Sequence, residues 1–141
     1  FIQPRVKAGP GEAATLLDDV LGDSFAIICW GGNPSYWMSD ATLALWRSLG
    51  ATLISAWPET QFDYEAARQT GEVRVVGDIG GQLKEWFGNH SSNIVFLRPD
   101  RFVCAMCKSQ QIDATTQKLA VALSLKNGVQ HELDEAAMSF A

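Results

Sequence analysis

The sequence lacks most features that mark membrane, nucleic-acid-binding or disulfide-stapled proteins. No apolar run approaches the roughly 20 residues that a membrane-spanning helix needs. The formal net charge of -5 argues against nucleic acid and against an anionic membrane as partners. Three cysteines are an odd number for a disulfide framework, and no signal peptide is recognisable. We therefore expect a reducing, cytoplasmic setting.

Length and composition predict one folded domain. Of the 141 residues, 47% are hydrophobic, which is ample for a core, and 19% are charged, which is below the usual quarter. The chain begins with Phe1 rather than Met, and its first dozen residues are rich in proline and glycine. We therefore expect residues 1–12 to be a linker with little regular structure from a preceding, absent region. Residues 13–128 would form the domain, and residues 129–141 a C-terminal tail.

Apolar runs with glycine or proline boundaries predict the strands of a sheet. Residues 24–30 form a continuous apolar run, which suits a central strand covered on both faces. Residues 52–57 predict a second strand, which ends at a proline, and residues 73–76 a third. A helix between the first two would make a right-handed parallel crossover.

Helix signals fall between and after these runs. Apolar residues at helical spacing predict a helix with Ser39 as its N-cap and Gly50 at its left-handed end. Residues 64–69 predict a helical turn, and residues 83–88 a short helix. Asp113 is expected to cap a last helix.

Residues 93–105 predict a β-hairpin, because two apolar runs flank a short polar turn. Pro99 suits the second position of a type I turn, and Asp100 can accept a local backbone hydrogen bond. The hairpin would add an antiparallel edge to the parallel strands. The pattern therefore predicts an α/β fold with a mixed sheet, a C-terminal β-hairpin and flanking helices.

Several motifs occur in an order and spacing that resemble a known family. They are QPRV at residues 3–6, LDDVLG at 17–22 before FAII at 25–28, WRSLGA at 46–51, the spaced set Asp78, Gly81, Leu83 and Trp86, and LRPDRFV at 97–103. From about residue 3 to about residue 125 they resemble the C-terminal domain of FAD-dependent aromatic-ring hydroxylases. Phenol and 3-(3-hydroxyphenyl)propionate hydroxylases are of this type.

The resemblance implies a thioredoxin-like fold without thioredoxin's chemistry. Such enzymes use FAD, NAD(P)H and dioxygen to hydroxylate a phenolic ring, and the chemistry would lie in the absent region. We therefore expect no catalytic, cofactor-binding or metal-binding residue in this chain. Its expected role is scaffolding against the catalytic FAD domain of the same polypeptide or at a subunit interface, and a homo-oligomer is left open.

The cysteines offer an alternative, a redox site. Cys104 and Cys107 form a C-x-x-C match, but they lie in the expected last strand, where residues three apart are roughly 10 Å apart. A disulfide needs Cα atoms within about 7 Å. A redox pair in this fold belongs after the first central strand, and residues 31–35 there contain no cysteine. We expect both thiols to be small hydrophobic side chains.

The sequence contains only incomplete patterns for a zinc site and for a phosphate site. A zinc site would draw on Cys29, Cys104, Cys107, His90 and His131, but only one close pair exists among them. A phosphate-binding loop is suggested by the glycines at residues 77–81, but the spacing matches no nucleotide fingerprint. We interpret this loop as a tight turn in which Asp78 caps the following helix.

Three residues are candidates for an interface. Arg98 and Arg101 flank the hairpin turn, where they either pair with Asp100, bind acidic groups on a neighbouring domain or remain solvated. Five tryptophans are many for this length, and they either face a partner, with Trp57 as the candidate, or cap a small core.

Two rival functions stay open. In a free-standing thioredoxin-like or peroxiredoxin-like protein, Cys29 would have to be the reactive thiol, yet it lies inside the first apolar run. A small protein-binding adaptor is compatible with exposed tryptophans. A thiol-titration or peroxide-consumption assay separates the redox function from the scaffold.

Overall fold

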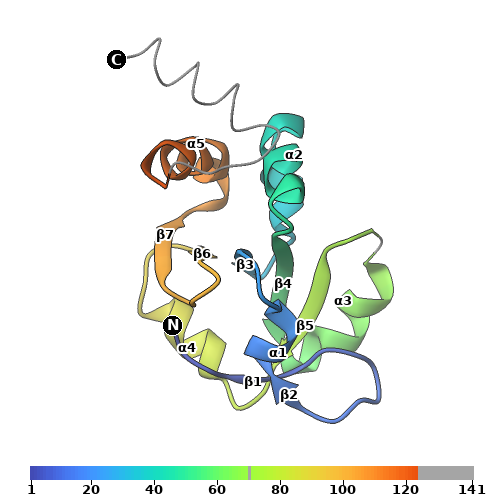
Figure 1. The fold of residues 1–141 in the computed structure, drawn as a ribbon. Coiled ribbons are helices and arrows are strands. Elements are labelled where there is room, and N and C mark those ends of the chain that lie inside the picture. The colour runs from blue at the N-terminus through green and yellow to red at the C-terminus, as the bar shows by residue number, and fades with distance from the viewer. Residues whose placement is uncertain (70, 124–141) are drawn as a thin grey trace.

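The computed structural model describes residues 1–69 and 71–123, which form a seven-stranded mixed sheet with helices on both faces (Figure 1). The strand order is β2-β1-β5-β4-β3-β6-β7. The strands are β1 (Arg5–Lys7), β2 (Thr15–Leu16), β3 (Ala26–Trp30), β4 (Thr52–Pro58), β5 (Arg74–Asp78), β6 (Ile94–Leu97) and β7 (Val103–Cys107). The helices are α1 (Leu17–Leu21), α2 (Asp40–Ser48), α3 (Phe62–Arg68), α4 (Gln82–Gly88) and α5 (Ile112–Ala122), with 3-10 turns η1 (Pro34–Trp37), η2 (Glu59–Gln61) and η3 (Ser109–Gln111).

The centre of the sheet follows the predicted strands. β3, β4 and β5 are parallel neighbours, and β6 lies antiparallel on the other side of β3. The β6–β7 hairpin forms the edge, as predicted. Ala26 to Cys29 are buried, which agrees with a strand covered on both faces.

Alternate residues of the central strands belong to two hydrophobic cores, one on each face of the sheet. On one face, Ile28, Ile54 and Val95 pack with apolar residues of α1 and α4. On the other face, Ile27 and Phe96 pack with apolar residues of α2 and α5. The period of two along a strand therefore divides the core between the two helical layers.

Local signals placed the helix ends and the hairpin turn. The Ser39 hydroxyl accepts from the Thr42 N–H at the start of α2, and Gly50 has a φ of 68° after its end. In the hairpin, the Arg101 N–H donates to the Arg98 carbonyl across Pro99, at 2.8 Å. These three predictions are confirmed.

The cap predicted for the last helix is wrong. The N-cap of α5 is Gln111, and Asp113 lies inside the first turn. Its carboxylate instead accepts from the Ser39 N–H at 2.9 Å, 74 residues away in sequence. The carboxylate therefore ties α5 to the start of α2 rather than capping its own helix.

The N-terminal segment is more regular than expected. Residues 1–12 were expected to have little regular structure, but β1 pairs antiparallel with both β5 and β2. Val6 is fully buried at this point. The strand forms because the far edge of β5 offers unpaired backbone groups that a neighbouring extended segment satisfies. The expected tail at residues 129–141, including His131, lies outside the described residues.

Candidate functional site

A cavity lies at the carboxyl ends of β3 and β4 and has a volume of about 420 Å³. The loop after β3 supplies Gly31, Gly32 and Asn33, and β4 supplies Ser55 and Trp57. In open α/β sheets, ligand sites commonly form at the carboxyl ends of the strands. We call this cavity the β3–β4 groove.

The loop at residues 31–35 stands where a redox pair would be expected. The Asn33 carboxamide oxygen accepts from the Ser35 N–H at 2.9 Å and from the Ser35 hydroxyl at 2.7 Å. Asn33 thereby caps η1, whose first residue is Pro34. The loop presents amide and hydroxyl groups and no sulfur.

Cys29 lies at the floor of the groove but is unsuited to nucleophilic chemistry. Its side chain is fully buried, and burial raises the pKa of its thiol to about 12, partly offset by a hydrogen bond with Ser109. The thiolate is the reactive form, so a thiol of this kind is almost entirely protonated near neutral pH.

The two strand cysteines also remain unpaired. Cys104 and Cys107 lie in β7, as predicted, and neither is in a disulfide. Burial raises the pKa of both thiols. The C-x-x-C match therefore contributes no activated thiol in this structure.

Polar groups at the floor of the groove satisfy one another. The Trp57 indole N–H donates to the Ser55 hydroxyl at 2.7 Å, which donates to the Gly32 carbonyl at 2.7 Å. The Asn93 side-chain amide donates to the Ser109 hydroxyl at 2.9 Å, and the Ser109 N–H donates back to the Asn93 side-chain oxygen at 3.1 Å. The floor therefore carries two separate sets of hydrogen bonds in which these polar side chains have partners.

The rim of the groove is aromatic and carries two opposite charges. Tyr36 is 81% exposed and Trp37 47% exposed, which is unusual for such large side chains. Glu65 and Arg68 come from α3, and their charged groups lie 3.8 Å apart.

The glycine-rich turn before α4 serves the helix itself. The Asp78 carboxylate accepts from the Leu83 N–H at 2.9 Å and from the Lys84 N–H at 3.0 Å. The predicted cap is confirmed, with Gly80 and Gly81 both at positive φ in the turn. The buried carboxylate takes the place that a phosphate would need.

Other classes of site are not evident in the described part of the chain. Residues 1–69 and 71–123 contain no group of three or more His, Cys, Asp or Glu side chains placed to hold a metal ion. Within the same residues, no helix has the length and apolar character to cross a bilayer.

Sequence comparison identifies the family. Residues 1–122 match the model of the HcaD C-terminal domain family. The chain belongs to the HcaD C-terminal domain family. The family predicted from the short motifs is thereby confirmed.

Curated relatives agree with this family. Similar proteins include 3-(3-hydroxy-phenyl)propionate/3-hydroxycinnamic acid hydroxylases of Paraburkholderia xenovorans (44% identity), Comamonas testosteroni (43%) and Escherichia coli (42%). The alignments cover 89%, 87% and 89% of this chain, but 20%, 20% and 22% of those proteins. The chain thus spans about a fifth of the length of these relatives.

Solved structures show the fold of this HcaD C-terminal domain. The Xanthomonas campestris bacterioferritin comigratory protein, described for alkyl peroxide reduction, superposes with a TM-score of 0.56 over 86% of this chain and 89% of that one. A cysteine-to-serine mutant of Xanthomonas campestris peroxiredoxin Q gives 0.54 over 87% and 89%. Both are 14% identical to this chain. The likeness confirms the predicted thioredoxin-like fold.

The three candidate interface residues of the HcaD C-terminal domain do not form one surface. Ala26 pairs with Leu97, so the hairpin turn that carries Arg98 and Arg101 lies at the start of β3. Trp57 lies at the other end of the sheet, beyond the pairing of Trp30 with Ala56.

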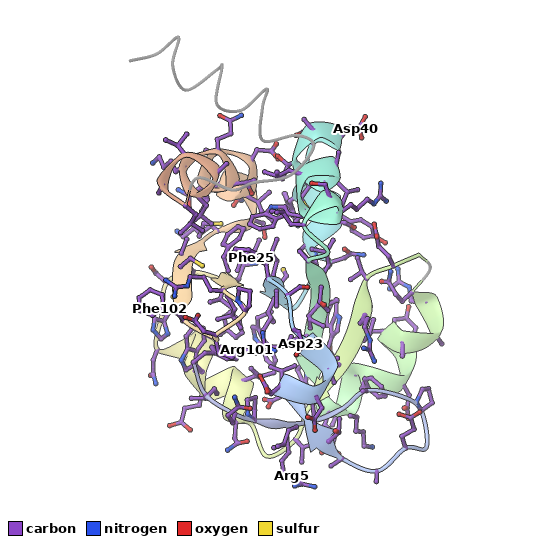
Figure 2. The ribbon with its side chains drawn as sticks, viewed as in Figure 1. Arg5, Asp23, Phe25, Asp40, Arg101 and Phe102 are labelled. Carbon is purple, nitrogen blue, oxygen red and sulfur yellow. The ribbon has the colours of Figure 1, made fainter. Side chains whose placement is uncertain are left out.

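The two arginines also differ in their contacts. Arg98 pairs with the Asp100 carboxylate, and its guanidinium lies 5.0 Å from the centre of the Phe102 ring. The side chain of Arg101 is only 14% exposed, and it is held by the Asp18 carboxylate and by carbonyl groups of the loop before β3. Figure 2 shows Arg101 between the hairpin and the connection that carries Asp23. Sequence reasoning missed the pairing with Asp18, because no local signal joins segments so far apart in the chain.

Proposed function

We propose that this chain is the non-catalytic C-terminal domain of a flavoprotein monooxygenase that hydroxylates phenolic substrates. The proposal rests on the match to the HcaD C-terminal domain family. Curated relatives that align with nearly the same part of the chain are named as hydroxylases of hydroxyphenyl acids. FAD and NAD(P)H would be bound by the catalytic region of the same polypeptide, in a cytoplasmic enzyme. The domain would contribute packing surface, with no catalytic residue of its own.

The described residues do not fit a dinucleotide cofactor. The one glycine-rich turn before a helix in residues 1–69 and 71–123 has the Asp78 carboxylate on its free N–H groups. A pyrophosphate would meet this negative charge at the position where it needs donors. We therefore derive no flavin step from this domain.

A scaffold role also agrees with the state of the thiols. Cys29 in β3 is fully buried. Residues 31–35 form the loop where a peroxide-reducing thiol would be needed, and they contain no cysteine. The likeness to peroxiredoxins concerns the fold, since sequence identity is 14%. These observations favour the scaffold over the redox protein.

For the interface itself, we propose that the hairpin turn contacts the catalytic region. Arg98 is partly exposed, and its ion pair within the described residues is with Asp100 on its own turn, so its guanidinium can exchange that partner for an acidic group. Arg101 would hold the turn in shape. Trp57 would contribute to an interface at the opposite end of the sheet, with a homo-oligomeric contact as the alternative partner there.

A domain-replacement experiment tests the proposal. The region matching this chain is removed from the Paraburkholderia xenovorans hydroxylase and replaced by residues 1–141. We expect the truncated enzyme to lose FAD or thermal stability, and the chimera to recover NAD(P)H-dependent hydroxylation of 3-(3-hydroxyphenyl)propionate. Retention of full stability and activity by the truncated enzyme would contradict a scaffold role. Peroxide turnover by this chain alone would favour the redox alternative.

The chimera also tests the hairpin contact. Arg98→Glu should lower the thermal stability of the chimera, because it reverses the charge at the proposed contact. Lys84→Glu, an equal charge change on the exposed surface of α4, serves as the control. Equal effects of the two variants would remove Arg98 from the interface.

A further inference from the structure

The β3–β4 groove keeps the size of a ligand site although the thiol chemistry of its fold is missing. Its volume of about 420 Å³ lies within the usual range for small-molecule pockets. The composition of the groove indicates what would fill it.

Aromatic rings form the walls of the groove. Tyr36 and Trp37 come from η1, and Trp57 comes from the end of β4. The indole N–H of Trp57 already donates to Ser55, so the Trp57 ring has apolar surface and π-face left for a ligand. Exposed aromatic rings around a hollow favour a flat, aromatic ligand.

One cation stands at the rim of the groove. Among the described lining residues, Arg68 is the only lysine or arginine, and its side chain is 62% exposed. The guanidinium lies 5.1 Å from the centre of the Tyr64 ring and 3.8 Å from the Glu65 carboxylate. That distance to Glu65 is longer than a hydrogen bond, so the guanidinium keeps N–H groups able to donate to a second carboxylate.

The floor of the groove is neutral and already paired. Ser55 is hydrogen-bonded to Gly32 and Trp57, Asn93 is hydrogen-bonded to Ser109, and Cys29 is buried at the same floor. A ligand would therefore bind through ring contacts and the rim charge, without a reacting group beneath it.

We propose that the β3–β4 groove binds an arylalkanoate, with its ring against Trp37 and Trp57 and its carboxylate at Arg68. The choice of this ligand class rests on the proposed function, because the curated relatives are named for hydroxyphenyl acids. The groove would then hold a molecule of the substrate or product class on the non-catalytic domain. No covalent step is involved.

Isothermal titration of this chain with 3-(3-hydroxyphenyl)propionate tests the proposal. We expect saturable one-to-one binding in the range of about 0.1 to 1 mM, as for a small ligand held by one ring site and one charge. 3-Cyclohexylpropionate, which lacks the aromatic ring, and 3-phenylpropionamide, which lacks the charge, should each bind at least about fivefold more weakly. No saturable binding, or equal binding of all three compounds, would overturn the proposal.

Matched variants locate the site. Trp37→Ala and Arg68→Gln should each raise the Kd about tenfold, because each removes one of the two recognition elements. Phe102→Ala and Arg47→Gln change an exposed ring and an exposed cation outside the groove, and should leave the Kd unchanged. Equal weakening by the control variants would place the binding elsewhere and overturn the proposal. The chimera experiment is independent of this titration, so failure of one is distinguishable from failure of the other.

Discussion

The guanidinium of Arg101 donates to the carboxylate of Asp18, although 83 residues separate them in the chain. The same guanidinium donates to the carbonyl groups of Gly22 and Ser24. Arg101 itself has a φ of 69°, the one non-glycine residue with positive φ among residues 1–69 and 71–123. The hairpin turn is therefore fastened to the segment between α1 and β3 by one side chain.

Replacement of Arg101 by Met should destabilise the domain. The substitution removes the donors from Asp18 and from two carbonyl groups, and we expect a loss of about 1 to 3 kcal/mol in the free energy of unfolding. Urea denaturation followed by tryptophan fluorescence measures it. Arg98→Met is the matched control, because the ion pair of Arg98 is with exposed Asp100, and its effect should be clearly smaller. Equal losses would mean that Arg101 does not fasten the hairpin.

Acid should weaken the same contact. A hydrogen bond from Arg101 lowers the pKa of Asp18, and one from the Ser39 N–H lowers the pKa of Asp113. A carboxyl group with a lower pKa in the folded chain stabilises the fold above its unfolded pKa, and this contribution is lost as the pH falls through the folded pKa. Stability should therefore decline as the pH falls below the ordinary value of 3.8.

Asp18→Asn isolates one of these contributions. As the pH falls from neutral to below 4, the free energy of unfolding should decrease less in this variant than in the parent chain. The reason is that the variant lacks the carboxyl group whose pKa is lowered in the folded state. Unfolding free energies measured across this range provide the check. In the Arg101→Met background the same substitution should have little effect on the pH dependence. An unchanged acid dependence in the single variant would contradict the assignment to Asp18.

Replacement of two glycines by alanine should change the free energy of unfolding in opposite directions. A Cβ at Gly77 would lie 2.8 Å from the Cβ of Phe62, closer than side-chain atoms pack, so Gly77→Ala should cost about 1 to 3 kcal/mol. A Cβ at Gly88, the last residue of α4, meets nothing within 4 Å among the described residues, so Gly88→Ala should add about 0.5 to 1 kcal/mol. Thermal denaturation of both variants checks the pair. Destabilisation by Gly88→Ala would contradict the helical role of that position.

The thiols should react in the order of their exposure. Cys104 is partly exposed, whereas Cys29 is fully buried with its thiol pKa raised to about 12. We expect Ellman's reagent to label Cys104 first at neutral pH, and Cys29 only when the protein unfolds. Mass spectrometry of the labelled peptides identifies each site, and labelling in guanidinium chloride provides the complete reaction. Rapid labelling of native Cys29 would show that the groove gives access to its sulfur.

The sequence predicted the central elements because their signals are local. Apolar runs, the Ser39 cap and the Pro99 turn depend on neighbours within a few residues. The missed strand β1 is short and lies in a segment rich in proline and glycine, and its pairing with β5 involves partners about 70 residues away in the chain. Asp113 was assigned to its own helix for the same reason, since a capping residue and a long-range acceptor look alike in sequence.

By itself, the sequence determined the central strands with the helices between them, the hairpin, the family and the absence of cysteine from residues 31–35. These properties follow from residue identity and from backbone preferences over short distances. Only the tertiary structure decided that Arg101 meets Asp18, that Cys29 is sealed, and that Trp37, Trp57 and Arg68 share one groove. These long-range contacts depend on strand register and helix packing. Residues far apart in the chain show no local pattern that would predict them.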